Sequence, residues 1–193
     1  MGAEYERKYR ASRESQNAVK EDFPDRWESI AMQTTYFDTP SGSLSAKRYM
    51  LRLRKENGIS LCTLKTKGMG NERGEWEAPC ACITDAVPVL CKLGCPADLA
   101  DLAEEGLVSI CGAEFIRQAQ TLETPDFAAE LALDQGMLFS AEKQLPLSEI
   151  EIELKSGSKE AMDAFAECFA AKYGLAAEEK SKFARALSLY KEV

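Results

Sequence analysis

Three glutamates in the C-terminal part of the chain alternate with large aliphatic residues. Glu149, Glu151 and Glu153 are separated by Ile150 and Ile152, which gives the stretch a period of two. This spacing predicts a β-strand with its carboxylates on one face, because residues two apart point in different directions on a helix. Neighbouring carboxylates repel one another unless cations lie among them. The stretch is therefore either an edge strand with a solvated acidic face or one wall of a charged site.

A second charged stretch, near the N-terminus, shows the same alternation. Glu4, Glu6 and Lys8 would share one face of a strand. Two acidic strands from opposite ends of the chain suggest a shared polar chamber. Clustered carboxylates are hard oxygen ligands of the kind that hold Mg²⁺ or Mn²⁺ in proteins.

The middle of the chain carries cations in strand register. Arg52 and Arg54 share one face of a strand, and the following Asn57-Gly58 pair is a strong hairpin signal. The returning strand places Lys65 beside them. A guanidinium can donate two parallel hydrogen bonds to a phosphate. This hairpin is therefore either a phosphate-binding wall or a basic solvated face.

Length, net charge and cysteine content argue against several classes of protein. The chain has 193 residues, which fits one domain over residues 1–193 with a substantial core. The formal net charge of −8 argues against a general nucleic-acid binder. The sequence has no apolar run long enough to span a membrane as a helix, and no signal-peptide core. Seven cysteines, no histidine and no paired CxxC spacing predict a reduced, cytoplasmic protein without a zinc site.

Hydrophobic periodicity divides the chain into strands and helices, so the expected class is α+β. Strands are expected at residues 3–10, 29–38, 48–55, 59–67, 72–78, 108–121, 127–136 and 147–155. Helices are expected at residues 14–22, 84–93, 97–105, 159–173 and 178–190. Nearly every strand is charged on one face and apolar on the other. In a soluble protein this pattern indicates a polar interior and an apolar outer face that helices must cover.

Several short motifs follow one another along the chain. They are Glu4-Tyr5-Glu6-Arg7-Lys8, Tyr36-Phe37-Asp38-Thr39-Pro40, Leu51-Arg52-Leu53-Arg54, Leu64-Lys65, Glu130-Leu131-Ala132-Leu133-Asp134, the acidic run over residues 149–157, and Ser181-Lys182-Phe183-Ala184-Arg185-Ala186-Leu187. In this set and order they resemble the CYTH-domain family of triphosphate tunnel metalloenzymes. The likeness extends from one end of the chain to the other. Asp38, within the second motif, either touches substrate or caps its own Thr-Pro turn.

The resemblance implies a closed eight-stranded antiparallel β-barrel that forms a tunnel. Its lumen would be polar and charged, and helices would pack on the outside. Outer-membrane barrels share the alternating pattern. The missing signal, the several helices and the lack of aromatic girdles argue against that class.

The resemblance also implies a division of roles inside the tunnel. Mg²⁺ or Mn²⁺ would be held by Glu4, Glu6, Glu149, Glu151 and Glu153, with Glu75, Glu130 and Asp134 as weaker candidates. The triphosphate would be bound by Lys8, Arg52, Arg54, Lys65, Arg73, Arg117, Lys182 and Arg185. Because the chain has no histidine, Lys8 or Lys182 is the candidate catalytic base, with a pKa lowered by surrounding cations.

The expected activity is metal-dependent hydrolysis of inorganic tripolyphosphate to pyrophosphate and phosphate. Open alternatives are a thiamine or nucleoside triphosphatase, a class IV adenylyl cyclase, and a polyphosphate or nucleotide sensor without turnover. An organic group would need an aromatic site, for which Trp27, Tyr36 and Tyr49 are loose candidates. The cyclases carry a His-Phe signature that this chain lacks. The expected partner is a triphosphate-containing small molecule, with a homodimer as an option and neither nucleic acid nor membrane.

Overall fold

The structure, a computed structural model, describes residues 5–67 and 73–191. In this part of the chain, nine strands form one antiparallel sheet in the order β5-β4-β3-β2-β6-β7-β8-β1-β9. All eight expected strands are present, and the short β9 is an addition. The strands are β1 (Glu6–Arg10), β2 (Glu28–Asp38), β3 (Tyr49–Glu56), β4 (Ile59–Lys67), β5 (Arg73–Pro79), β6 (Val108–Glu123), β7 (Phe127–Ser140), β8 (Lys143–Gly157) and β9 (Ala176–Ala177).

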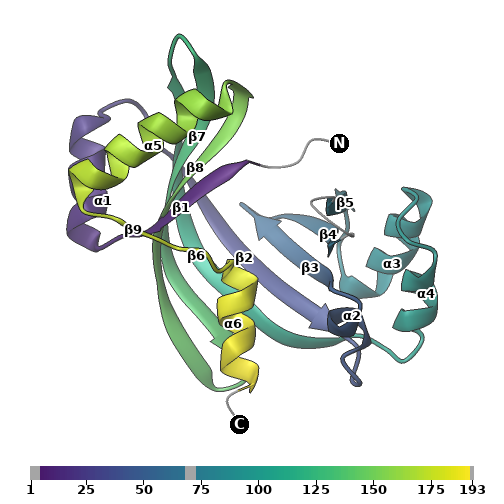
Figure 1. Ribbon diagram of the computed structural model, residues 1–193. Coiled ribbons are helices and arrows are strands. Elements are labelled where there is room, and N and C mark those ends of the chain that lie inside the picture. Colours follow the sequence, from purple (N-terminus) through teal and green to yellow (C-terminus); the bar gives the residue numbers. More distant parts are fainter. Residues whose placement is uncertain (1–4, 68–72, 192–193) are drawn as a thin grey trace.

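The sheet is strongly curved (Figure 1). β1, β7 and β8 form one wall, β3, β4 and β5 form the opposite wall, and β2 and β6 lie between them. The α+β class with a large antiparallel sheet is therefore confirmed. Over the described residues the hydrogen-bonded order ends at β5 and at β9, and no pairing joins these two ends. Closure into an eight-stranded barrel thus stays a prediction.

The N-terminal strand β1 lies inside the sheet rather than at the position that chain order alone would give. It pairs with β8, so that Glu6 lies opposite Glu153 and Lys8 lies opposite Glu151. On its other side β1 pairs with β9. The two ends of the chain are therefore joined in one wall, as the acidic strands suggested.

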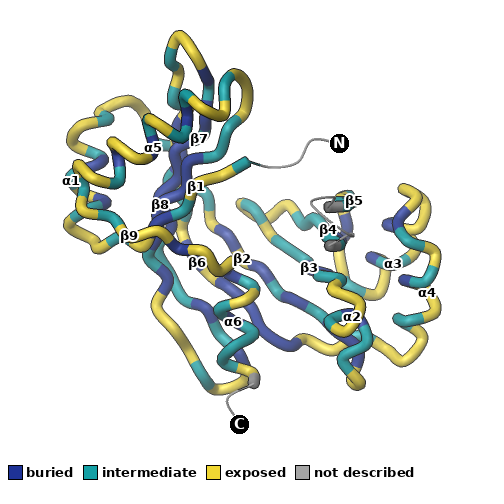
Figure 2. The backbone as a smooth tube through the Cα atoms, in the orientation of Figure 1, coloured by how far each residue is buried: buried dark blue, intermediate teal, exposed yellow. Residues whose placement is uncertain are grey.

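Helices in two groups cover the convex face of the sheet (Figures 1 and 2). The first group packs on β1, β7 and β8 through a core that includes Leu131, Ile150 and Ile152. The second group covers β3 and β4, where Leu51 and Leu64 are fully buried. Their bounds are α1 (Arg13–Asp22) and α5 (Lys159–Tyr173) in the first group, and α2 (Ser43–Ala46), α3 (Ile83–Lys92) and α4 (Asp98–Ala103) in the second. None of the helices in the described residues is long and apolar enough to cross a membrane.

The last helix, α6 (Lys182–Lys191), packs on the concave face instead. Phe115 shares this face with Arg117 two residues on, and Leu147 shares it with Glu149. Phe183 of α6 belongs to the same apolar cluster as Phe115 and Leu147. The prediction that the helices pack on the outside is therefore wrong for α6. At one end of the concave face the side chains are apolar. Packing α6 against them removes this apolar surface from water.

Asp38 caps a turn, which confirms the structural alternative for this residue. It is buried, and its Oδ1 accepts hydrogen bonds from the backbone N–H groups of Thr39 at 2.8 Å and Leu44 at 2.9 Å. Its Oδ2 accepts from the N–H of Ser45 at 3.2 Å. The carboxylate thus satisfies the start of α2, away from the concave face.

Removing this cap should cost stability. Asp38→Ala leaves three N–H groups without their acceptor, and we expect the free energy of unfolding to fall by about 1–3 kcal/mol. Guanidinium unfolding measures the change. Asp38→Asn keeps an oxygen for the two bonds at Oδ1, so it should retain most of the stability. Equal losses in both variants, or no loss in the alanine variant, would contradict the capping role.

Candidate functional site

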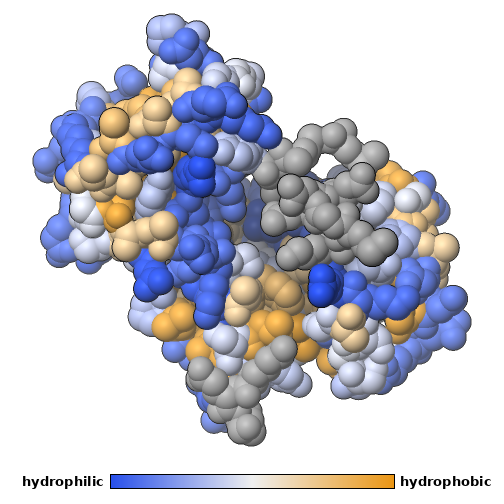
Figure 3. Space-filling view, in the orientation of Figure 1, coloured by the Kyte–Doolittle hydropathy of each residue, from blue (hydrophilic) through white to orange (hydrophobic). Residues whose placement is uncertain are grey.

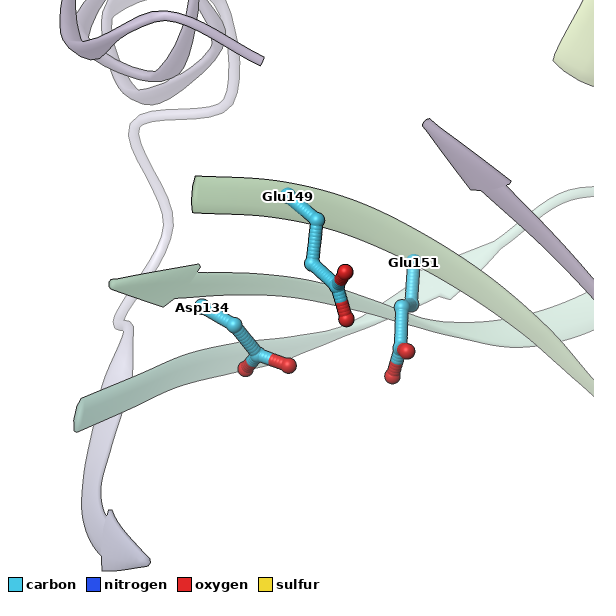
Figure 4. Close-up of side chains that lie close together, drawn as sticks. All are labelled: Asp134, Glu149 and Glu151. Carbon is cyan, nitrogen blue, oxygen red and sulfur yellow. The ribbon is translucent and has the colours of Figure 1, made fainter. Parts of the chain in front are cut away.

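Three carboxylates converge on the concave face, at the centre of the wall formed by β7 and β8. Asp134 lies opposite Glu149 in the register of these strands, and Glu151 follows on the same face of β8. Oxygen atoms of the three side chains lie within 4.8 Å of one another. All three residues are buried, and Figure 4 shows them pointing into one space. Such a cluster needs compensating cations, because burying several carboxylates together is costly.

Three cations from other elements supply that compensation. The Nζ of Lys182, at the start of α6, lies 2.8 Å from Asp134 Oδ2 and 2.8 Å from Glu151 Oε1, and it contacts Glu149. Arg117 on β6 donates two hydrogen bonds of 2.8 Å to Asp134 and contacts Glu151. Arg185, one turn after Lys182, contacts Glu149.

These contacts set the protonation states. Burial opposes the charged form of Lys182, but Glu151, Asp134 and Glu149 outweigh it and raise the lysine pKa. Burial likewise opposes ionisation of Glu151, yet Lys182 and Arg117 hold its pKa below the usual range. For Glu149 burial dominates and raises the pKa. The predicted lowering of the Lys182 pKa is therefore wrong, because this ammonium is surrounded by carboxylates and not by cations.

The opposite wall is basic and less fully compensated. Arg52 is buried; it donates to Thr63 Oγ1 at 3.2 Å, and its closest described carboxylate oxygen is 3.6 Å away, on Glu77. Arg54 donates to Thr34 Oγ1 at 3.2 Å and reaches Glu56 only at 3.4 Å. Burial, followed by the charge of Arg52, lowers the pKa of Arg54. The two arginines of this wall thus have looser carboxylate contacts than the cations of the acidic cluster.

The two walls face each other across a hollow in the molecular surface, with hydrophilic side chains gathered at its margin (Figure 3). Cross-strand pairs connect the walls along the floor. Thr34 on β2 lies opposite Arg54 on one side and Ala113 of β6 on the other. The concave face therefore combines a neutralised acidic cluster with a basic wall that has room for anionic groups.

Most of the remaining predicted site residues pair with neighbours on their own strand or on an adjacent strand. Glu6 and Glu153 are paired across β1 and β8, and Lys8 Nζ lies 3.7 Å from Glu6 Oε1. Lys65 pairs with Glu75 at 3.1 Å on β4 and β5. Glu4 and the side chain of Arg73 lie outside the described residues. Glu130, a weaker candidate, lies 3.5 Å from Arg117 Nη1.

Sequence reasoning underrated one residue and missed another. Asp134 was a weaker candidate, yet it is at the centre of the acidic cluster. Glu178 was not considered. It is buried, its Oε2 lies 3.0 Å from Arg10 Nε and 3.6 Å from Arg185 Nη1, and its N–H bonds to the Lys8 carbonyl. No periodic pattern surrounds Glu178, so nothing in the sequence distinguished it from the exposed Glu179.

The sequence is similar to those of known proteins. The family model of the CYTH domain matches residues 2–187. An inorganic triphosphatase from Haemophilus influenzae is 31% identical over 144 residues, which are 72% of this chain and 40% of that protein. The chain thus spans less than half the length of this relative.

Two solved structures share the fold. HpAC1 from Hippeastrum, named as an adenylyl cyclase and reported to have a dominant triphosphatase activity, is 19% identical, with 96% of both chains covered and a TM-score of 0.67. The PH1819 protein from Pyrococcus horikoshii is 20% identical, with 97% of this chain and 99% of that chain covered and a TM-score of 0.65. At these identities the likeness concerns the fold alone. Because the family model spans nearly the whole sequence, this chain belongs to the CYTH domain family.

Proposed function

We propose that this protein hydrolyses inorganic tripolyphosphate to pyrophosphate and phosphate with the help of Mg²⁺ or Mn²⁺. The observation that carries the proposal is the incomplete compensation of Arg52 and Arg54 opposite a cluster of carboxylates. Arg52 is buried and Arg54 is partly buried, and their closest described carboxylate contacts are 3.6 Å and 3.4 Å, so an anion would stabilise both guanidinium groups. A linear triphosphate would supply several negative charges to these guanidinium groups, while metal ions would neutralise its remaining charges.

The carboxylates fit the implied metal by type. Glu6, Glu149, Glu151 and Glu153 offer the hard oxygen atoms that Mg²⁺ and Mn²⁺ prefer, and Glu4 would join them. Glu149 Oε1 is buried, and although it contacts Lys182 it makes no hydrogen bond of good geometry among the described residues, so it retains capacity as a ligand. These carboxylates would hold the metal, whose contribution would be to neutralise negative charge on the substrate.

The protein side chains would bind and orient the substrate. Arg52 and Arg54 would each donate paired hydrogen bonds to phosphoryl oxygens, and Lys65 and Lys8 would add single charges from the flanking strands. Lys182 and Arg185 would reach the same oxygens from α6, which already carries their charges into the concave face. Held in this way, the terminal phosphorus can be attacked in line by water.

The proposal includes closure of the sheet between β5 and the edge formed by β1 with the short β9, into an eight-stranded tunnel within one domain over residues 1–193. The curvature, which turns these two edges towards each other, supports it (Figure 1). A closed wall would exclude water around the charged groups and so strengthen their interactions with substrate.

The aromatic residues favour an inorganic substrate. Tyr36 is buried against Phe183, with ring centroids 4.8 Å apart. Tyr49 donates its hydroxyl hydrogen to Asp98 on α4, and the Trp27 indole donates to the Phe23 carbonyl. All three candidates for binding an organic group are thus engaged elsewhere. The Haemophilus relative, named an inorganic triphosphatase, agrees with this choice.

A phosphate-release assay tests the proposal. Purified protein receives tripolyphosphate, ATP or thiamine triphosphate with Mg²⁺, with Mn²⁺ or with a chelator. We expect rapid release from tripolyphosphate only when metal is present. Faster release from ATP or thiamine triphosphate would favour an organic substrate, cyclic AMP from ATP would indicate a cyclase, and binding without release would indicate a sensor.

Removing one carboxylate should change the metal requirement. Glu151→Gln keeps the shape of the side chain but loses its charge, so we expect lower activity and half-saturation at a higher Mg²⁺ concentration. Glu142→Gln, in the exposed turn between β7 and β8, is the matched control and should behave as wild type. Activity that survives a chelator would sink the metal-dependent mechanism.

A further inference from the structure

The cysteines of this protein are unevenly distributed. All seven are free, and Cys111 and Cys168 lie on β6 and α5. The other five gather at the β4, β5 and α3 corner of the molecule, on the convex side and away from the charged site. They are Cys62, Cys80, Cys82, Cys91 and Cys95.

Two of these thiols are held together by the way α3 ends. The Gly94 N–H bonds to the Cys91 carbonyl at 3.0 Å, and the Cys95 N–H bonds to the Leu90 carbonyl at 3.3 Å. Gly94 has a φ of 78°, so this is a Schellman motif, which turns the chain back beside the last helical turn. As a result Cys95 Sγ lies 3.7 Å from Cys91 Sγ and donates its S–H to it.

The two thiols differ in access. Cys91 is exposed, whereas Cys95 is 9% exposed and packs in the core with Leu90 and Leu99. Burial, together with the hydrogen bond to Cys91, raises the pKa of Cys95 to about 12. Cys95 therefore stays protonated while Cys91 is free. Once Cys91 has reacted, its sulfur no longer contributes to the raised pKa of Cys95.

We propose that Cys91 and Cys95 form a reversible disulfide, with Cys91 as the attacking thiol and Cys95 as the resolving thiol. Cys91, as the thiolate, attacks a low-molecular-weight disulfide RSSR, and one RS⁻ leaves. Cys95 then loses its proton and attacks Cys91 Sγ, and the second RS⁻ leaves. The two protein thiols lose two electrons and two protons, which convert RSSR into two RSH. The sulfurs must approach by about 1.7 Å to reach a disulfide bond length of about 2.05 Å, within the reach of side-chain rotation.

A neighbouring pair supplies an internal comparison. Cys62 and Cys80 are also close enough for their thiols to interact, but both are buried. Because an external disulfide must reach one thiol first, this pair should remain reduced in the folded protein.

The turn between α3 and α4 leads to Asp98, which contacts the strand that carries the basic wall. Asp98, at the start of α4, accepts hydrogen bonds from Lys47 Nζ at 2.7 Å and from the Tyr49 hydroxyl at 2.9 Å. Tyr49 begins β3, the strand that carries Arg52 and Arg54. The disulfide would therefore fix the connection that holds the outer end of the basic wall.

The test counts thiols in the folded full-length chain. The protein is incubated with glutathione disulfide at pH 8, unfolded, alkylated and weighed intact. We expect two of the seven thiols to escape alkylation without the added mass of a glutathione, and dithiothreitol to restore all seven. Trypsin cuts after Lys92, which lies between the two cysteines, so the disulfide should appear as two linked peptides.

Two variants make the result specific. Cys91→Ser should lose thiols only with the added mass of a glutathione, since the attacking sulfur of the pair is gone. Cys168→Ser, which removes an exposed cysteine on α5, should still lose two thiols without that added mass. The proposal is overturned if the wild type loses no thiols without added glutathione mass, if a linked peptide joins Cys62 to Cys80 instead, or if Cys91→Ser still loses two thiols without that mass.

Discussion

Replacing Arg54 with glutamine is expected to lower kcat/KM for tripolyphosphate by roughly a hundredfold or more, because a partly buried charge that would bind the substrate is lost. The protein should remain as stable as wild type or become slightly more stable. In the free protein this guanidinium is partly buried beside Arg52 with its closest described carboxylate contact at 3.4 Å, so its removal relieves repulsion.

The experiment has a matched control in the next residue. Lys55 is on the same strand but points to the exposed, convex side, so Lys55→Gln removes the same charge from the molecule without touching the concave face. Initial rates over a range of tripolyphosphate concentrations give kcat/KM, and guanidinium unfolding gives stability. Equal activities of the Arg54 and Lys55 variants would show that the basic wall does not bind substrate.

Lys182→Met is expected to have the largest effect on stability, a loss of about 3–5 kcal/mol of unfolding free energy in the absence of metal. Methionine keeps the apolar length of the side chain but removes the ammonium that lies among Asp134, Glu149 and Glu151. Two partly buried arginines, Arg117 and Arg185, remain as partners, yet three carboxylates cannot all stay ionised beside them at no cost.

The control for this variant is Lys180→Met, two residues earlier, where the side chain is exposed. Guanidinium unfolding of both variants at neutral pH, with a chelator present, compares the two positions. A Lys182 variant as stable as the Lys180 variant would mean that the ammonium is not needed to hold the acidic cluster together.

Most of the sheet follows from local pattern. Alternation of charged and aliphatic residues identified β3 and β8, and charged residues two apart identified β1, because period two assigns each side chain to a face whatever the partner strand is. The Asn57-Gly58 signal placed the β3–β4 hairpin, whose structure has positive φ at both residues.

The placement of α6 could not be predicted in the same way. Its apolar residues show which side of the helix is buried, but they do not say which face of the sheet receives it. That depends on Met32, Phe115, Leu138 and Leu147, which come from four strands and form an apolar area only after the sheet has assembled.

The error about Lys182 has the same origin. A count of cations along the sequence suggested a lysine among positive neighbours. The structure shows that Asp134 and two glutamates converge on it, and their approach depends on the β7–β8 register and on the position of α6. Electrostatic environments that arise from several distant segments are not encoded by spacing along the chain.

The pairing of β1 with β8 has a consequence for how the protein is made. Glu6 and its partner Glu153 are separated by 147 residues (153 − 6), so β1 leaves the ribosome long before the strand it pairs with. At about 5–20 residues per second, this interval lasts roughly 7–30 s. Lys8 and the glutamates of β8 therefore cannot meet until the chain has been synthesised as far as β8.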